Sequence, residues 1–318
     1  ASIFYSRRIG GVPQKYDEVS GELVEHEQIK ENPYDLQLIN ATKISGRTKN
    51  GLGVGLLNAI TQTSKAEILD TLTGQSRFFT TQPITNYSVC AVDQTFGTNS
   101  FVSVINTNYY NTFQASNVTA AELNLEDKNK LYIFRGIVGH SYNDTNEKSH
   151  GNSYSVKAGK NGGKFHALYY LTVKDDSFDQ NTMGFMTQNN LFANEVLFKY
   201  NMLKPFSIFL NMKNYLDFNY FRMYKPNVFS YFTMSYTNIT QFRNYYLLSS
   251  KITYSPGKSR DYYETRTPGR FLENESWMGT YLSISTNKSK KLNLSAYIDY
   301  SQSVVGRPVV VVYRIGNE

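Results

Sequence analysis

The segment Phe206-Ser-Ile-Phe-Leu-Asn-Met-Lys213 decides the fold class, because apolar residues recur in it at every second position. The apolar positions are Phe206, Ile208, Leu210 and Met212, with Ser207, Asn211 and Lys213 between them. A second segment, Leu292-Asn-Leu-Ser-Ala-Tyr-Ile-Asp299, repeats the pattern with Leu292, Leu294, Ala296 and Ile298. Successive side chains of a β-strand point to opposite faces, so both segments are predicted to be strands with one apolar and one polar face.

The same alternation recurs in short segments along most of the chain, and two kinds of protein produce it. A soluble sandwich buries the apolar faces between two sheets, whereas a membrane barrel turns them outward into lipid. The chain has 26 Tyr and 20 Phe residues, yet its mean hydropathy is only -0.45. No apolar run reaches the roughly 18 residues of a membrane helix. We therefore predict an all-β protein, an antiparallel transmembrane β-barrel of about 14–16 strands with long loops.

The domain organisation follows from where the alternation begins. Residues 1–36 are irregular and mixed in charge, so we expect a lead-in segment over 1–36 and the barrel over 37–318. Residues 38–61 predict a hairpin, because Asn50-Gly51 favours a tight turn. The capping-box pattern of Thr119-Ala-Ala-Glu122 predicts a short helical turn over 119–128. The remaining connections are expected at 63–84 and 175–190 and in the long loops 110–129, 140–150 and 255–275.

The charge distribution argues against one kind of partner, and the cysteine content excludes one kind of cross-link. The net charge is +7, but no basic cluster exceeds a pair such as Arg7-Arg8 or Lys290-Lys291, so we expect no nucleic-acid partner. The single Cys90 excludes an internal disulfide. The chain starts with Ala-Ser-Ile-Phe, without Met or a signal peptide, and is expected to be processed or to be part of a longer protein.

Motifs for catalysis are missing from the sequence. It contains no Gly-x-Ser-x-Gly, P-loop, His-Glu-x-x-His or cysteine pair. His140 and His150 flank a polar stretch and could meet around a metal ion, but no third ligand is apparent in the sequence. We therefore expect no enzyme activity, no catalytic residues, no cofactor and no metal site.

Two groups of residues are candidates for binding. A cation that faces lipid at mid-depth costs about 2–4 kcal/mol, so lysines within strands should point into the lumen or lie at its rims. These lysines are Lys43, Lys164, Lys199 and Lys213. They are compatible with a plainly polar interior and also with a lumen that prefers anions. Aromatic and Arg residues tend to anchor protein interfaces, and four in the 255–275 loop are predicted partner contacts, namely Tyr262, Tyr263, Arg266 and Arg270.

Several stretches resemble a known family. They are Phe4–Gly10, Ala41–Thr48, Gly51–Thr61, Asn99–Asn108, Asp176–Phe185 and Tyr262–Arg266. In this order they resemble the C-terminal barrel of a Bacteroidetes family described as domain of unknown function 5916. The resemblance implies an outer-membrane location and supplies no catalytic residues. Gly11 stands where an Arg is common in the family, which puts any role of that Arg in doubt.

The family also suggests what surrounds such a barrel. A carbohydrate-binding module similar to family 9 usually precedes it, and nothing here matches that module, so the chain resembles the later part of a longer protein. We expect a non-enzymatic outer-membrane β-barrel that acts as a structural or accessory subunit of a cell-envelope complex. Its partners would be membrane lipid, envelope proteins and carbohydrate bound through the upstream module. The alternatives are a porin-like channel or transporter for small solutes, anions among them, and, less in keeping with the missing motifs, an enzyme with its site in the long loops.

Overall fold

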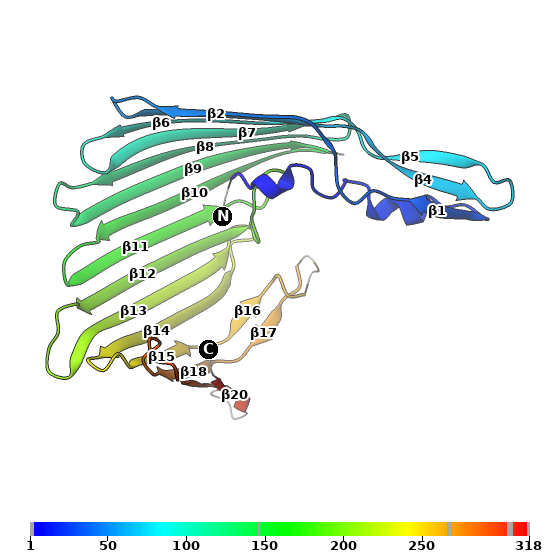
Figure 1. Ribbon diagram of the computed structural model, residues 1–318. Helices are drawn as coiled ribbons and strands as arrows, with labels where there is room; N and C mark the ends of the chain where they lie inside the picture. The colour runs from blue at the N-terminus through cyan, green and yellow to red at the C-terminus, as the bar shows by residue number, and fades with distance from the viewer. Residues whose placement is uncertain (1–2, 146, 266, 268, 304–307, 317–318) are drawn as a thin grey trace. The chain divides into compact units, whose positions relative to one another are not determined.

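The fold is all-β and antiparallel. The computed structural model describes residues 3–316 except 146, 266, 268 and 304–307, with residues 308–316 described through their backbone (Figure 1). The strands form a main sheet of 15 strands, a small sheet of three and a pair of two. Among the described residues, no helix is both long and apolar enough to cross a membrane.

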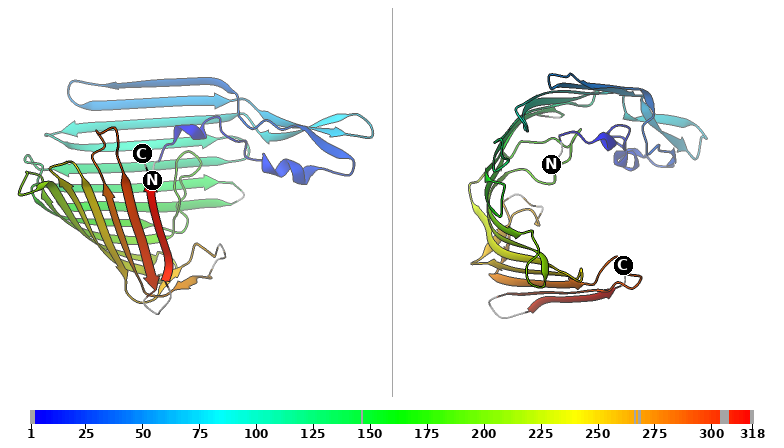
Figure 2. Two further views of the ribbon diagram at one scale, coloured as in Figure 1. Left: turned by 60° about the horizontal axis from the view of Figure 1, so that its bottom comes forward. Right: turned by 60° about the vertical axis from the view of Figure 1, so that its left-hand side comes forward.

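The main sheet has the order β2-β3-β6-β7-β8-β9-β10-β11-β12-β13-β14-β15-β18-β19-β20. Its first strands are β2 (Leu38–Arg47), β3 (Leu52–Thr61), β6 (Thr85–Phe96), β7 (Ser100–Tyr110), β8 (Ala115–Glu126), β9 (Tyr132–Asp144), β10 (Lys148–Lys160) and β11 (Phe165–Lys174). The others are β12 (Leu191–Met202), β13 (Phe209–Met223), β14 (Phe229–Phe242), β15 (Leu247–Ser255), β18 (Trp277–Ser285), β19 (Ser295–Ser303) and β20 (Pro308–Gly316). Figure 2 shows these strands following one another in chain order.

The sheet order is an up-and-down meander with two ends. In the described part of the chain, β2 pairs only with β3 and β20 only with β19, so each end of the main sheet has an open edge. The chain divides into two compact units. Unit 1 comprises residues 1–123, 137–153 and 174–189, and unit 2 comprises 124–136, 154–173 and 190–318.

Two hairpins interrupt the meander. In unit 1, β4 (Ser64–Asp70) and β5 (Ser76–Gln82) lie between β3 and β6 in the chain and pair with each other, and β4 also pairs with β1 (Glu27–Glu31). In unit 2, β16 (Ser259–Asp261) pairs with β17 (Leu272–Asn274). The short 3-10 helices η1 (Ser6–Arg8) and η2 (Asp17–Glu22) precede β1.

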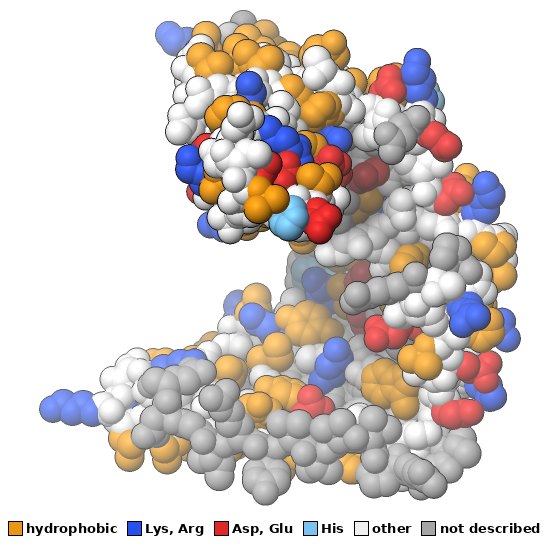
Figure 3. Space-filling view, turned by 90° about the vertical axis from the view of Figure 1, so that its right-hand side faces the viewer, with side chains coloured by type: hydrophobic (Ala, Val, Ile, Leu, Met, Phe, Trp, Pro, Cys, Tyr) orange, Lys and Arg blue, Asp and Glu red, His pale blue; other side chains and the backbone are white. Residues whose placement is uncertain are grey.

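The small sheet β1-β4-β5 has its own apolar core and its own ion pairs. Val19 of η2 packs on Ala66 and Ile68 of β4, and all three are fully buried. Arg77 of β5 binds Glu27 of β1 through two nitrogens, with both Nε–Oε1 and Nη2–Oε2 distances at 2.7 Å. Figure 3 shows the acidic and basic side chains interspersed on the part of the molecule nearest the viewer. Charge pairing therefore links β1 to the hairpin across this sheet.

Acid should release this link. The hydrogen bonds from Arg77 lower the pKa of Glu27 from its usual 4.5 to about 2. Since the carboxylate pKa is lower in the folded chain, the pairing stabilises the small sheet above pH 4.5 and is lost as the pH falls from 4.5 to about 2. ¹³C NMR of the Glu27 carboxyl carbon should show this shifted titration. In an Arg77→Gln variant its midpoint should move back toward 4.5, and an unmoved midpoint would contradict the assignment.

Several predicted connections are strands. The segment 63–84 holds the hairpin β4–β5 rather than a loop, and β1 lies within the lead-in segment predicted to be irregular. The helical turn predicted at 119–128 is wrong, because β8 runs through Glu126. The loops predicted at 110–129 and 140–150 are mostly strand as well, since β8, β9 and β10 extend into them. The loop between β11 and β12 is present as predicted.

The strand boundaries differ at both segments that decided the fold class. Phe206 and Ile208 precede β13, because Ser207 adopts a left-handed backbone conformation (φ 45°) that interrupts the strand. Leu292 and Leu294 precede β19. None of the apolar residues of either alternation is buried, and Ile208, Leu292, Leu294 and Ile298 are more than a third exposed.

Each unit presents two different faces of the main sheet. In unit 1, Leu57, Ala59, Tyr87 and Val89 share a face that other parts of the chain pack against, here called the covered face. The opposite, open face carries exposed apolar side chains, namely Leu52, Val54, Leu56, Val92, Val102 and Val104. In unit 2, one face carries Lys199, Lys213, Tyr215 and Asp217 and is called the charged face. The opposite, apolar face exposes Leu216, Tyr220, Tyr236, Ile252, Met278, Leu282, Ile284 and Ile298.

Candidate functional site

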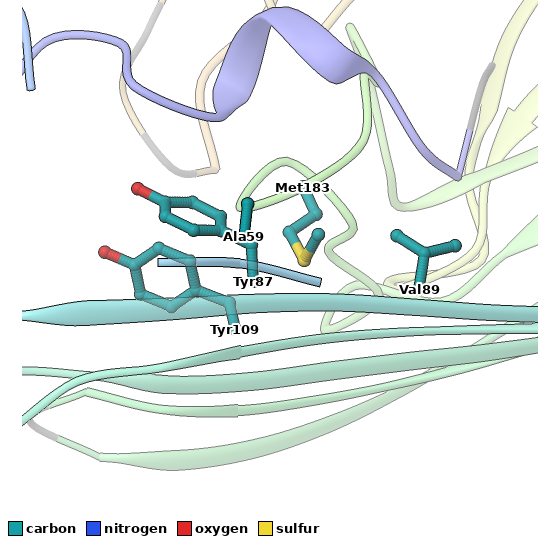
Figure 4. Close-up of a cluster of buried hydrophobic side chains, with 5 residues drawn as sticks. All are labelled: Ala59, Tyr87, Val89, Tyr109 and Met183. Carbon is teal, nitrogen blue, oxygen red and sulfur yellow. The ribbon is translucent and has the colours of Figure 1, made fainter. Parts of the chain in front are cut away.

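An aromatic cluster marks the centre of the covered face. Ala59, Tyr87 and Tyr109 lie directly opposite one another on β3, β6 and β7, so their side chains share this face. The two tyrosine rings meet edge to face, with centroids 5.2 Å apart. Figure 4 shows the hydroxyl groups directed to the same side, with Met183 of the β11–β12 loop beside the rings. The cluster is buried in the described chain.

The β11–β12 loop is seated on this face by a close backbone approach. A Cβ atom on Gly151 of β10 would lie 2.2 Å from the backbone N and Cα of Phe178, so only glycine permits the contact. The Phe178 ring is 2% exposed and lies close above Gly139 of β9. Beside it the Asp179 amide donates to Ser141 Oγ (3.0 Å), and Asn143 Nδ2 donates to the Asp179 carbonyl (3.1 Å). The loop is therefore held by both packing and polar contacts.

The N-terminal segment binds both this loop and the cluster. The Tyr5 amide donates to the Met183 carbonyl at 2.7 Å, and Arg8 Nε donates to the Gly184 carbonyl at 3.2 Å. Phe4 and Ile9 pack against the aromatic cluster. The segment 3–14 thus covers the sheet by contacts with the cluster on β3, β6 and β7 and with a loop more than a hundred positions later in the chain.

A network of amide and hydroxyl groups joins these parts. Gln82 Nε2 donates to Thr85 Oγ1 (2.9 Å) and to the Tyr109 hydroxyl (3.0 Å), while Gln82 Oε1 accepts from the Gln14 amide (2.9 Å). Asn111 Nδ2 donates to the Tyr109 hydroxyl at 2.8 Å and to Gln14 Oε1 at 2.9 Å. Buried polar groups without partners are costly, so this network ties the N-terminal segment to the ends of β5 and β7.

The network borders a pocket of about 350 Å³. The residues around it are Arg7, Arg8, Gly11, Val12, Gln14, Leu36, Gln82, Tyr87, Tyr109, Gln114, Asn181 and Thr182. Gln114 Nε2 closes one side by donating to Thr182 Oγ1 at 3.1 Å. Amides, hydroxyls and two guanidinium groups can hydrogen-bond a small polar or anionic molecule. The pocket side chains can therefore bind such a molecule through hydrogen bonds.

Asn111 is the residue whose loss should weaken this site most. Its Oδ1 accepts from the amides of Phe113 and Gln114, both at 2.8 Å, in addition to the bonds its Nδ2 donates. Asn111→Ala should lower the free energy of unfolding by about 1–3 kcal/mol, because buried partners are left unsatisfied. Denaturant unfolding in detergent, followed by circular dichroism, measures this.

The matched control is Asn244→Ala. Asn244 is exposed and accepts one turn bond, from the Tyr246 amide at 3.2 Å. Its loss should change stability by less than about 0.5 kcal/mol. Equal losses of unfolding free energy in the two variants would show that the buried network contributes no more to stability than one exposed turn hydrogen bond.

The four predicted lysines lie at different places in the structure. Lys43 of β2 pairs with Leu57, so it lies on the covered face, and its side chain is exposed. Lys199 and Lys213 are on the charged face of unit 2, where Lys199 Nζ lies 5.7 Å from the Tyr215 ring centre. Lys164 lies in the β10–β11 connection, and its carbonyl accepts from the Asn201 amide at 2.7 Å. Of the four, only Lys199 and Lys213 occupy adjacent strands on one face.

The predicted partner contacts lie around the β16–β17 pair. The Tyr262 ring packs on Phe271 with centroids 5.2 Å apart, and the Tyr263 hydroxyl donates to the Asn190 carbonyl at 3.0 Å. Arg270 is exposed. Arg266 lies outside the described residues. Tyr262 and Tyr263 therefore already make contacts within unit 2.

The pocket residues were not identified from the sequence. Gln14, Gln82, Asn111 and Thr182 are ordinary polar residues in separate segments, and no spacing connects them. One available signal is the order Asn111-Thr-Phe-Gln114 between two strands, which is typical of a side-chain-capped turn. That signal would have indicated a tight connection there instead of a long loop.

Comparison with known proteins identifies a family but no characterised relative. No curated protein and no solved structure matches the chain. One family model does match, and its description is a domain of unknown function (DUF5916). The match covers residues 1–315, which is nearly all of the sequence and includes the N-terminal segment, the pocket and both units. The chain therefore belongs to the DUF5916 family.

Proposed function

We propose that the chain is an outer-membrane β-barrel without enzyme activity, a structural or accessory subunit of a cell-envelope complex. The observation that carries the proposal is the exposed apolar surface on one face of the main sheet in each unit. In unit 2 it includes Leu216, Ile252 and Leu282, each more than a third exposed. Contiguous apolar surface of this extent marks a contact with lipid or with another protein. Closure of the 15-stranded meander would satisfy its edges in lipid.

The opposite faces support the same proposal. In unit 1 the covered face is filled by the chain's own N-terminal segment and loop, and in unit 2 the charged face holds Lys199 and Asp217. Charges are costly toward hydrocarbon and acceptable in a barrel interior. In each unit, apolar side chains thus lie on one face of the sheet. The other face carries polar side chains or is covered by other segments of the chain, as expected for the wall of a barrel.

A row of asparagines limits the apolar surface of unit 1. Asn58 Nδ2 donates to Asn86 Oδ1 at 3.3 Å, and Asn106 Nδ2 donates to Asn117 Oδ1 at 3.0 Å. These residues share the open face with Leu56 and Val92 but lie nearer the strand ends that carry the longer connections. We infer that the hydrocarbon layer ends at this row, and that the asparagines lie in the headgroup layer or beyond it.

Lipid contact can be tested with paired tryptophans. In a Trp277→Phe background, which removes the single tryptophan, Leu216→Trp and Tyr215→Trp place the probe at neighbouring positions on opposite faces. In vesicles of brominated lipid, fluorescence from position 216 should be strongly quenched and that from position 215 should not. Equal quenching, or quenching only at position 215, would refute the proposed orientation.

The accessory role rests on the family resemblance and on the exposed loops, and it includes a link to carbohydrate through a preceding module. Purification of the natural full-length protein in mild detergent, followed by mass spectrometry, should recover a stoichiometric envelope protein. A protein that stays alone and conducts ions would favour the second candidate.

That second candidate is a channel for small anionic solutes, and the charged face of unit 2 favours it. Lys157 Nζ lies 5.6 Å from the Tyr170 ring centre, and Lys199 and Lys213 follow on neighbouring strands. Planar-bilayer recordings test this directly. A steady unitary current that prefers anions, and loses the preference in Lys199→Glu, would establish the channel, whereas an absence of current would exclude it.

A further inference from the structure

The β9–β10 hairpin brings two histidines together on the open face of unit 1. His140 Nε2 lies 3.5 Å from His150 Nδ1, and the two rings are stacked with centroids 5.6 Å apart. Both side chains are exposed. Their strand neighbours Ser141 and Gly151 face the other way and support the β11–β12 loop. The histidine pair is therefore accessible and is separate from the pocket on the covered face.

A chain of hydrogen bonds fixes the orientation of His140. Asp175 Oδ2 accepts from Asn152 Nδ2 at 3.3 Å and from the Asn152 backbone amide at 2.6 Å. This directs Asn152 Oδ1 toward His140 Nδ1, 3.0 Å away. Because an amide oxygen only accepts, His140 Nδ1 must carry the proton and donate it. In neutral His140 the Nε2 lone pair is then directed toward His150 Nδ1.

The separation of the two facing nitrogens fits a shared metal ion better than a direct hydrogen bond. The nitrogen of an N–H donor normally lies about 2.7–3.2 Å from its acceptor. The distance of 3.5 Å between the two histidine nitrogens is therefore long for a hydrogen bond. Two imidazole nitrogens bound to one tetrahedral Zn²⁺ at about 2.0–2.1 Å each lie roughly 3.3–3.4 Å apart. A shift of a few tenths of an ångström therefore brings both nitrogens into coordination distance.

We propose that His140 Nε2 and His150 Nδ1 bind a divalent transition-metal ion, Zn²⁺ in the first instance. Asn152 and Asp175 are the positioning residues, in the arrangement by which carboxylates and amides orient metal-binding histidines elsewhere. The Asp144 carboxylate of the same hairpin is bonded by the Tyr142 hydroxyl at 3.0 Å and paired with Lys148 Nζ at 4.0 Å. Imidazole ligands suit Zn²⁺, Cu²⁺ and Ni²⁺ and disfavour Mg²⁺ and Ca²⁺.

The remaining coordination positions are open. Among the described residues, no group of three or more His, Cys, Asp or Glu side chains is placed to hold a metal ion. Water, or a donor from another molecule, must complete the coordination shell. The site is therefore an exchangeable one, on the surface that the barrel proposal places beyond the hydrocarbon layer, and it does not depend on that proposal.

Metal titration of the purified chain tests the site. The protein is prepared without a histidine tag, stripped with EDTA and titrated with Zn²⁺ by calorimetry. Saturable binding of one ion is expected. His140→Gln and His150→Gln should each weaken it by about tenfold or more, and Asn152→Leu by about tenfold, as removal of an orienting partner does.

The control is His26→Gln. His26 directly precedes β1 and is not part of the β9–β10 hairpin, so this variant should leave Zn²⁺ affinity unchanged. Each variant is compared with the parent by circular dichroism. A measurement on the parent chain needs no variant: the Cu²⁺ electron paramagnetic resonance spectrum should show two nitrogen ligands. Absence of saturable binding, unchanged affinity in both histidine variants, or a Cu²⁺ spectrum without two nitrogens would each overturn the site.

Discussion

Replacing Gly151 with alanine is expected to release the β11–β12 loop from the sheet. The added Cβ would lie 2.2 Å from the Phe178 backbone, so either the loop or β10 must move. Gly151 does not have a positive φ, so the alanine is tolerated by its own backbone and the effect is a steric one. Overpacking of this kind costs about 1–3 kcal/mol. Phe178 should become a cleavage site, which limited chymotrypsin digestion followed by mass spectrometry would detect.

Gly46→Ala is the matched control for this variant. Gly46 lies in β2, and a Cβ there would meet nothing within 4 Å. This variant should keep the parent's digestion pattern and stability. If Gly151→Ala also leaves Phe178 protected, the loop is held by contacts other than the close approach at this glycine.

On the proposed membrane orientation, replacing Leu216 with lysine is expected to block membrane assembly. Leu216 lies in the middle of β13 between Phe198 and Tyr236, on the apolar face of unit 2, and is 40% exposed. A lysine facing lipid near the midplane costs about 2–4 kcal/mol. Folding into lipid vesicles, measured by heat-dependent migration on gels and by protease protection, should fall sharply.

Lys213→Leu serves as the opposite change on the same strand. Lys213 pairs with Asn201 and Ile239 and lies on the charged face, so losing its charge should leave assembly close to that of the parent. Comparable insertion of both variants would mean that the two faces do not differ in lipid exposure. Impaired insertion of Lys213→Leu alone would reverse the face assignment.

The strands were predictable wherever one face of the sheet is apolar, because apolar and polar residues then alternate in the sequence. In β3, Leu52, Val54 and Leu56 alternate with glycines, and both the strand and its Asn50-Gly51 turn are found where they were expected. Boundaries were less predictable, as Ser207 shows. Its left-handed backbone places the start of β13 at Phe209, although the alternation in the sequence already begins at Phe206.

The helical turn predicted at 119–128 failed for a different reason. The Thr119-Ala-Ala-Glu122 pattern offers only local capping, whereas the strand buries Val118 and Ala120 on the covered face. Burial against other parts of the chain outweighs a local preference. The end of the β9–β10 hairpin, residues 140–150, was predicted to be a loop because both of its faces are polar there. Ser141 and Asn143 bind the loop on one face, while His140 and His150 lie on the other, so no apolar period remains.

The candidate site depends on contacts that no local pattern records. Tyr5 meets Met183, and Gln14 meets Gln82 and Asn111, across separations that only the folded sheet brings together. A polar residue in a connection looks the same in sequence whether it is solvated or part of a buried network. The glycine at position 151 likewise carries no signal until the loop that crosses it is known.

The β4–β5 hairpin has a consequence for how this family can diversify. Thr61, the last residue of β3, is the direct partner of Thr85, the first residue of β6. The chain therefore leaves and rejoins the main sheet at adjacent points, whatever lies between. The insert between these two residues can vary in length. As long as its two ends stay as far apart as neighbouring strands are, the register of every following strand is preserved. The β4–β5 insert can therefore be replaced by another segment without changing the pairing of β3 with β6.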